Sequence, residues 1–330
     1  MANIKIDFAC SEYDRTRALE DGTVRPAGID LNFVRLPVID TFWRMCQHQE
    51  FDASEMSFSA YLILRSRPNP PFRAIPVFLS KIFRHACVFI NKNAGIRKPE
   101  DLVGKRIGVP EYAMTAVVWI RGIMQHEHGV DPANVTWVTG GQEQWGRKER
   151  VDLNLPPSIK IESAPEPKTL SDMLQTGEID ALFTATVPSS FYKPSSNVVR
   201  LFPNFREVEI DYYKRTGCFP IMHLVVIKES LLQEHSWIAK NLYDAFCKAK
   251  DHCIKILEHT GAPGAALPWI IDDLEATRKV LGKDHWSYGV EANRTTIETL
   301  IQYSWKQGLS ERKLTLEEVF AESTFEVSKV

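Results

Sequence analysis

The stretch Leu102-Val-Gly-Lys-Arg-Ile-Gly-Val-Pro110 sets the pattern for the middle of this chain. It begins with a short helical turn, turns at Gly104 and continues as an apolar strand over residues 106–109. A helix is predicted over 115–128, and another strand over 135–139. Strand, helix and strand in this order are typical of a βαβ unit, which places these strands in a parallel sheet.

The segments before this stretch repeat the same alternation. Ile4, Ile6 and Phe8 alternate with charged residues, which predicts a strand over 3–9. A second strand is expected over 31–36 and a helix over 39–48, so the first 65 residues have the order β-α-β-α-β-α. Two apolar strands follow, at 74–79 and 85–91. These segments predict a first lobe with a largely parallel sheet.

The segments after this stretch divide the chain further. Residues 140–168 are polar and rich in Gly, Pro and charge, which suits a loop or insertion over a site. A helix over 170–175 and a strand over 179–184 continue the second series, and 223–227 is another apolar strand. From 231 to about 319 the pattern is mostly helical, including 237–257, 271–281 and 295–307. We therefore expect a discontinuous first lobe, residues 1–92 with 221–330, and a second lobe, residues 93–220.

Composition and charge exclude several classes of protein. The 330 residues are 44% hydrophobic and 25% charged, which is ordinary for a globular chain and excludes disordered, collagen-like and disulfide-scaffold classes. Forty Lys and Arg residues against 42 Asp and Glu residues leave a net charge of −2. This balance gives no electrostatic case for a nucleic acid or a membrane as partner, although a local basic pocket for a small anion stays open.

The termini and the motifs narrow the class further. Lys5 and Asp7 interrupt the apolar run that a signal peptide needs, and no stretch reaches the roughly 18–20 apolar residues of a membrane helix, so we expect a soluble, cytoplasmic protein. The six cysteines are scattered, without CxxC or zinc-type spacing. The sequence contains no GxxxxGK[ST], GxGxxG or GxSxG, which disfavours nucleotide-dependent and hydrolase-elbow chemistry.

Two motifs resemble a known fold. Leu102–Pro110 resembles the signature that opens the second lobe of type II periplasmic-binding-protein folds, and Leu174-Gln-Thr-Gly-Glu-Ile-Asp-Ala181 resembles another signature of that lobe. The resemblance implies an α/β fold of two lobes, with a ligand cleft between the lobes and a helical C-terminal region. Such motifs identify a fold and leave the chemistry open.

A closer resemblance covers essentially the whole chain. It is to the 4,5-dihydroxyphthalate decarboxylase family, cytoplasmic enzymes of this fold. The segments that carry it are Ser11-Glu-Tyr-Asp-Arg-Thr16, Gly28–Leu31, Phe42–Met45, Glu50-Phe-Asp-Ala-Ser-Glu-Met-Ser57, Ile75–Phe78 with Arg84 and His85, and Gly108–Tyr112. The resemblance implies non-oxidative decarboxylation of 4,5-dihydroxyphthalate to 3,4-dihydroxybenzoate (protocatechuate) and CO2 in phthalate degradation. It also implies an aromatic dicarboxylate as ligand and a homo-oligomer.

This reaction needs a base near the ring hydroxyls and an acid near the carbon that loses CO2. Asp14 and Glu55 are the candidate partners of the hydroxyls, and His85 and His223 are the candidate proton donors because imidazole titrates near neutrality. Carboxylates favour arginines, hydroxyls and the backbone N–H groups that open a helix. The candidates for substrate binding are Arg15, Ser57, Arg84, Tyr112, Thr115, Arg147 and Thr184. No organic cofactor is required by this chemistry.

Several alternatives stay open. Asp14, Glu55 and Ser57 are also suited to capping helices, and the two histidines to a place in the core. Arg147 lies in a charged run of a kind that is usually solvated. A divalent metal held by His85, Glu55, Asp14 and His223 is a further hypothesis for binding the catechol. Two other classes of protein also compete, a solute-binding protein for an aromatic carboxylate and the effector-sensing domain of a regulator.

Overall fold

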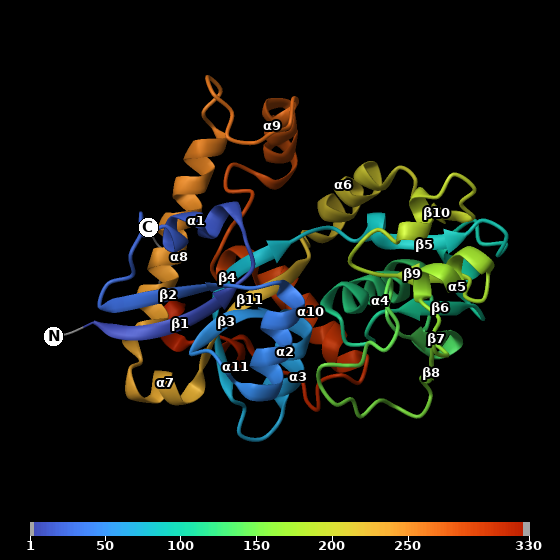
Figure 1. Cartoon of the computed structure of the whole chain (residues 1–330), viewed down its shortest axis with the longest axis horizontal. Helices are drawn as coiled ribbons and strands as arrows, with labels where there is room; N and C mark the ends of the chain where they lie inside the picture. Colours follow the sequence, from blue (N-terminus) through green and yellow to red (C-terminus); the bar gives the residue numbers. More distant parts are fainter. Residues whose placement is uncertain (1–2, 326–330) are drawn as a thin grey trace. The chain divides into compact units, whose positions relative to one another are not determined.

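The computed structural model describes residues 3–325, which divide into two compact units. The first unit contains residues 3–81, 221–298 and 314–325, and the second contains 82–220 and 299–313. Each unit is built on one β-sheet (Figure 1).

The observed division differs from the expected lobes at two segments. Residues 82–92 were expected in the first lobe but belong to the second unit, because β5 (Val88–Asn91) pairs antiparallel with strands of that unit. Residues 299–313 also belong to the second unit. There, Gln307 Oε1 accepts a hydrogen bond of 2.8 Å from Arg121 Nε. Both segments therefore belong to the unit that contains their hydrogen-bond partners, although the residue that precedes each of them belongs to the first unit.

The first unit contains a mixed five-stranded sheet. In sheet order its strands are β2 (Ile29–Arg35), β1 (Ile4–Cys10), β3 (Ala53–Ser57), β11 (Ile221–Lys228) and β4 (Phe72–Lys81). β1 pairs in parallel with β2 and β3, which confirms the parallel arrangement predicted from the first 65 residues. β11 runs antiparallel to both β3 and β4, so the sheet as a whole is mixed.

Helices surround this sheet and dominate the C-terminal third of the chain. Those of the first unit are α1 (Arg17–Glu20), α2 (Val38–His48), α3 (Phe58–Ser66), α7 (Glu229–Glu234), α8 (Trp237–Leu257), α9 (Ile270–Leu281) and α11 (Leu316–Val319), and α10 (Arg294–Lys306) contributes residues to both units. α8 packs on β1, with the rings of Phe246 and Phe8 edge to face at 5.3 Å. Within residues 3–325, no helix has both the length and the apolar character needed to cross a membrane.

The second unit contains a six-stranded sheet. In sheet order its strands are β10 (Val198–Arg200), β5, β9 (Ala181–Phe183), β6 (Arg106–Val109), β7 (Thr136–Thr139) and β8 (Lys160–Ser163). β9, β6, β7 and β8 are parallel, as a βαβ series requires. The expected strand over 85–91 begins only at Val88, since His85–Cys87 form a 3-10 turn. The segment over 140–168 is not all loop, because it contains β8.

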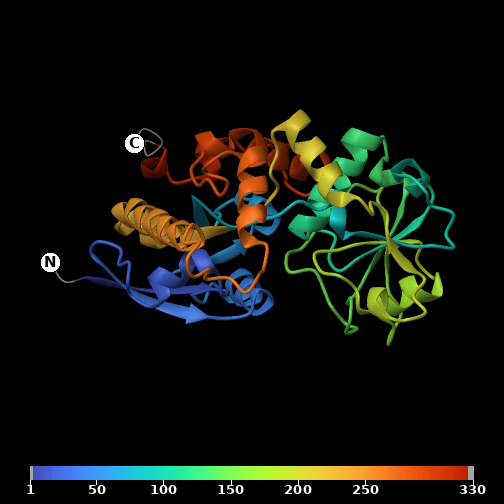
Figure 2. The same cartoon turned by 90° about the horizontal axis from the view of Figure 1, so that it is seen from above.

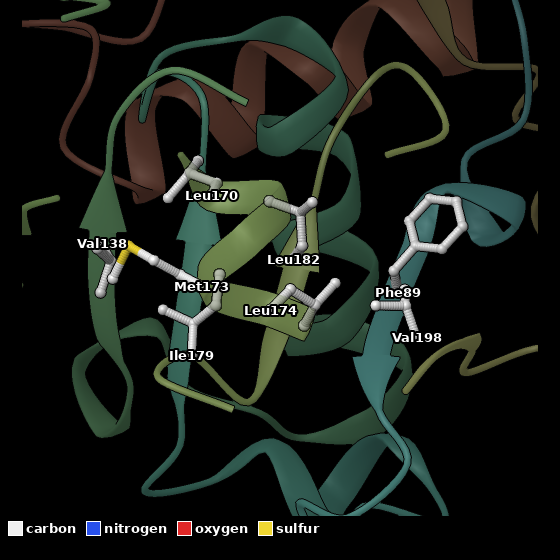
Figure 3. Close-up of a cluster of buried hydrophobic side chains, with 8 residues drawn as sticks. All are labelled: Phe89, Val138, Leu170, Met173, Leu174, Ile179, Leu182 and Val198. Atoms are coloured by element: carbon white, nitrogen blue, oxygen red, sulfur yellow. The ribbon is translucent and has the colours of Figure 1, made fainter. Parts of the chain in front are cut away.

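Two helices cover this sheet from opposite sides, α4 (Thr115–His128) and α5 (Leu170–Thr176), and α6 (Phe205–Thr216) follows β10 (Figure 2). α5 lays Leu170, Met173 and Leu174 over the strands (Figure 3). The other buried members of this cluster are Phe89, Val138, Ile179, Leu182 and Val198. The helix ends at Gly177, whose φ of +82° is a left-handed conformation that glycine adopts without strain.

The second glycine of the opening stretch has a packing reason. A Cβ at Gly108 would lie 2.6 Å from Ile179 Cδ1, 3.2 Å from Leu182 Cδ1 and 3.3 Å from Leu170 Cδ2. All three neighbours are fully buried in the same cluster, so they have little space into which to move. β6 must therefore have no side chain at this position if α5 is to pack against the sheet.

We predict that Gly108→Ala lowers the free energy of unfolding by about 1–3 kcal/mol, because it overpacks this cluster. The loss should shrink when Ile179→Ala is introduced together with it, since the second change removes the atom that the new Cβ meets. Denaturant unfolding of the four proteins of this double-mutant cycle provides the measurement. Additive losses would show that Gly108 is not needed for close packing.

Candidate functional site

A fully buried carboxylate lies at the centre of the first unit. All five residues of β3 are buried, and Glu55, the middle one, has 0% of its surface exposed. A buried carboxylate is costly unless hydrogen-bond donors surround it. Glu55 Oε2 accepts from the backbone N–H of Ser11 at 3.0 Å, and Oε1 accepts from Tyr13 Oη at 2.5 Å and from His223 Nδ1 at 2.7 Å. Three residues from two segments of the chain, the loop after β1 and strand β11, therefore converge on this one side chain.

His223 reaches Glu55 because β11 runs beside β3. In this antiparallel pair His223 lies opposite Ser57, which places it on the diagonal to Glu55. The imidazole is 19% exposed and packs edge to face on Phe42 at 4.9 Å. Since a carboxylate accepts hydrogen bonds, Nδ1 carries the hydrogen in this contact, and Nε2 is the ring nitrogen left for other chemistry.

The electrostatics of this cluster favour an ionised Glu55. Burial opposes its ionisation and is the largest single influence, but the contacts with His223, Tyr13 and Ser11 together hold its pKa below the ordinary value. The same burial, with the charge of Glu55 nearby, raises the pKa of Tyr13 and that of Cys10. The phenol and the thiol therefore stay protonated near neutrality, as hydrogen-bond donors to Glu55 require.

The other expected residues of the first unit have mainly local partners. Asp14 begins a 3-10 turn, and its carboxylate accepts from Arg15 Nη1 at 2.9 Å. Arg15 Nε donates to the carbonyl oxygen of Leu79 at 2.9 Å. Ser57 caps α3, where its Oγ accepts from the N–H of Ala60 at 3.5 Å. Asp14, with 53% of its side chain exposed, is the one of these three that faces solvent widely.

A second cluster of charges lies within the second unit, around the start of α4. The buried Glu111 pairs with two arginines, with Nη2 of Arg147 at 2.5 Å and Nη2 of Arg150 at 2.9 Å. Glu149 accepts from the backbone N–H of Tyr112 and, at 3.3 Å, from that of Ala113. The backbone N–H groups that we expected to bind a substrate carboxylate therefore hold a carboxylate of the chain itself, and Arg147 is paired rather than solvated.

Tyr112 is buried, and the guanidinium of Arg121, a residue that the sequence analysis did not single out, stacks on its ring. The guanidinium of the fully buried Arg121 lies 3.6 Å from the centre of the Tyr112 ring, and its Nη1 donates to the carbonyl oxygen of Tyr112 at 3.1 Å. Thr115 is the first residue of α4 and is also buried. Burial raises the pKa of Glu149 to about 7, and the neighbouring Glu111 contributes in the same direction.

The remaining expected residues lie in the interior of the second unit. His85 is 3% exposed and packs against the rings of Phe202 and Tyr212, each at 5.3 Å. Burial lowers its pKa to about 4, so this imidazole is neutral at pH 7. Arg84 Nη1 donates to the carbonyl oxygen of Ala185 at 3.2 Å, and Thr184 Oγ1 donates to Gln142 Oε1.

The structure thus brings together Glu55 and His223 from the expected set, and adds residues that the sequence analysis missed. Tyr13 and Ser11 lie within the Ser11–Thr16 motif, but the sequence pattern led us to assign site roles only to its charged residues, Asp14 and Arg15. Glu149 lies in a charged run beside Arg147. Among residues 3–325, no three His, Cys, Asp or Glu side chains are arranged to hold a metal ion, so the structure does not show the metal cluster of His85, Glu55, Asp14 and His223 considered above.

Comparisons with known proteins extend over the whole chain. A family model described as NMT1/THI5 like matches residues 77–151. A 4,5-dihydroxyphthalate decarboxylase of Comamonas testosteroni is 36% identical over 330 residues, which are 100% of this chain and of the relative. A second protein of that name, from Pseudomonas putida, is 39% identical over 214 residues, or 65% of this chain and 83% of the relative.

Solved structures resemble this chain in fold. The periplasmic aliphatic sulphonate binding protein SsuA of Escherichia coli matches with a TM-score of 0.56 at 10% identity, over 98% of this chain and 99% of that protein. The alkanesulfonate-binding protein SsuA of Xanthomonas axonopodis pv. citri matches with a TM-score of 0.51 at 10% identity, over 98% of each chain. The predicted fold class, periplasmic-binding-protein-like with α/β lobes, is confirmed.

The raised pKa of Glu149 generates a prediction about pH. A carboxyl group whose pKa is higher in the folded chain than in the unfolded chain binds its proton more tightly when folded, so stability falls as pH rises from about 4.5 to about 7. Glu149→Gln removes this ionisation. We expect the variant to gain about 1–3 kcal/mol of unfolding free energy relative to the parent between pH 5 and pH 8.

Urea unfolding at several pH values, followed by tryptophan fluorescence, measures this difference. Glu143→Gln is the matched control, because Glu143 is exposed and lies in the same segment. A constant difference between the Glu149 variant and the parent across this range would show that the carboxyl of Glu149 has an ordinary pKa.

Proposed function

The chain belongs to the 4,5-dihydroxyphthalate decarboxylase family, and from this premise we propose that it converts 4,5-dihydroxyphthalate to 3,4-dihydroxybenzoate and CO2. The substrate has two adjacent carboxylates and two adjacent hydroxyls on one ring. A hydroxyl para to the leaving carboxylate supplies electron density to the carbon that bears it. That carbon takes a proton and a C–H bond forms. The C–C bond to the carboxylate then breaks, its electron pair returns to the ring, and CO2 leaves without net oxidation or reduction.

The observation that carries the chemical part of the proposal is the contact of 2.7 Å between Glu55 and His223 Nδ1. A carboxylate that holds one ring nitrogen fixes the orientation and the tautomer of an imidazole. We assign to His223 Nε2 the transfer of the proton to the ring carbon. Glu55 is fully buried, so it acts through His223 and not on the substrate.

Asp14 is our proposal for the base at the hydroxyls. Its carboxylate is exposed, and it lies one residue from Tyr13, whose hydroxyl contacts Glu55. Deprotonation of the para hydroxyl increases the electron density at the reacting carbon, and a carboxylate within hydrogen-bond reach performs this step.

One assay tests the proposed function directly. The purified protein is incubated with 4,5-dihydroxyphthalate, with and without a chelator, and CO2 and 3,4-dihydroxybenzoate are followed. The proposal expects both products in equal amounts in both conditions. Loss of turnover with the chelator would favour a metal-dependent reaction, and binding without turnover in either condition would contradict the proposal.

Variants of the two histidines separate the candidate proton donors. We predict that His223→Gln and Glu55→Gln each lower kcat by about 10²–10⁴-fold while KM changes little, since proton transfer is lost and the substrate contacts remain. His85→Gln is the matched control, because His85 is a buried, neutral imidazole of the second unit. A large loss of kcat in His85→Gln with near-normal turnover in His223→Gln would transfer the role of proton donor to His85.

A binding function without chemistry is the second candidate. The likeness in fold to proteins named for binding sulphonates, which are anionic organic ligands, favours it. This candidate predicts saturable binding of an aromatic carboxylate, measured by calorimetry, and no release of CO2 over hours. Turnover in the assay above would exclude it as the sole function.

A further inference from the structure

We propose that Tyr13 is a positioning residue that keeps Glu55 in the carboxylate form on which His223 depends, an inference that rests on the function proposed above. The Tyr13 hydroxyl lies 2.5 Å from Glu55 Oε1 and 3.4 Å from His223 Nδ1. It therefore stands at the junction of the two groups. Because the phenol donates its one hydrogen to the carboxylate, Oε1 accepts two hydrogen bonds, one from Tyr13 and one from His223.

The ring of Tyr13 is held in place from the other side by Arg15. The guanidinium carbon of Arg15 lies 4.3 Å from the centre of the Tyr13 ring and 4.3 Å from the centre of the Trp286 ring, so the cation is sandwiched between the two aromatic rings. Arg15 and Trp286 are each anchored to β4, through the carbonyl oxygens of Leu79 at 2.9 Å and Phe78 at 3.0 Å. This stack fixes the direction of the Tyr13 hydroxyl.

The surroundings of Glu55 show why a donor at this position matters. From β1, Cys10 Sγ lies 3.7 Å from Oε2, and the N–H of Ser11 follows it. From the 3-10 turn, Arg15 and Asp14 pair with each other, which leaves little net charge toward the carboxylate. Apart from His223 on β11, the donors are thus neutral. Because burial is the largest influence on Glu55 and opposes its ionisation, each neutral donor counts.

The experiment compares the parent protein with Tyr13→Phe, which removes the hydroxyl and keeps the ring that stacks on Arg15. We expect kcat near neutral pH to fall about ten-fold and KM to stay within about three-fold. The acid limb of the kcat profile should move upward by about one pH unit, because Glu55 takes up a proton more readily without this donor. Tyr243→Phe, a change at a buried tyrosine of the first unit, is the control, and its profile should not move.

A second measurement does not depend on activity. In protein labelled with 13C at the glutamate side-chain carboxyl, the signal that disappears in Glu55→Gln reports the ionisation of Glu55. Its titration midpoint should rise by about one pH unit in Tyr13→Phe and stay unchanged in Tyr243→Phe. An unchanged midpoint, or a fall in kcat without movement of the acid limb, would overturn the role of Tyr13.

The two measurements separate the possible failures. If the parent protein does not release CO2, the proposed function fails while the carboxyl titration still decides whether Tyr13 controls Glu55. If the parent turns over and neither the titration midpoint nor the acid limb moves in Tyr13→Phe, the inference about Tyr13 fails and the proposed function stands. Circular dichroism of Tyr13→Phe confirms that the variant is folded before either result is interpreted.

Discussion

The burial of Glu55 in the middle strand of the first sheet is the constraint on which the candidate site depends. A carboxylate with no exposed surface in a strand between two others must find its partners within the protein. The chain provides them from two segments, namely the loop after β1, which contains Ser11 and Tyr13, and β11, which contains His223. Each of these segments therefore contacts the same acidic side chain. They pack around a buried carboxylate where a protein core usually contains an apolar side chain.

This arrangement separates two tasks that a single exposed carboxylate would have to combine. Glu55 has no access to a ligand, yet it determines which nitrogen of His223 carries the hydrogen. His223 is partly exposed and presents its other nitrogen. A buried carboxylate behind a more exposed imidazole is a general way to obtain a well-oriented acid or base near neutral pH. In the second unit, the buried Glu111 pairs with Arg147 and Arg150, and Glu149 accepts from backbone N–H groups.

Much of the fold was predictable from local sequence, because the signals that specify it are local. Gly108 and Gly177 lie where a side chain or an ordinary φ angle is excluded, and the apolar positions of α8 give the helix over 237–257 that the structure contains. The position of β11 beside β3 was not predictable in the same way. The contact between Glu55 and His223 joins residues 168 positions apart, and only the pairing of distant strands creates it. Tyr13 was missed because its hydroxyl acts through that same contact.

The central claim is that His223 Nε2 transfers the proton to the ring. The most direct test is a crystal structure of the Glu55→Gln variant with 4,5-dihydroxyphthalate bound. The account predicts that the ring carbon bearing the leaving carboxylate lies about 3–3.5 Å from His223 Nε2, the separation at which a proton can pass between them. A bound ring whose carboxylate-bearing carbons all lie beyond the reach of His223 would contradict the account.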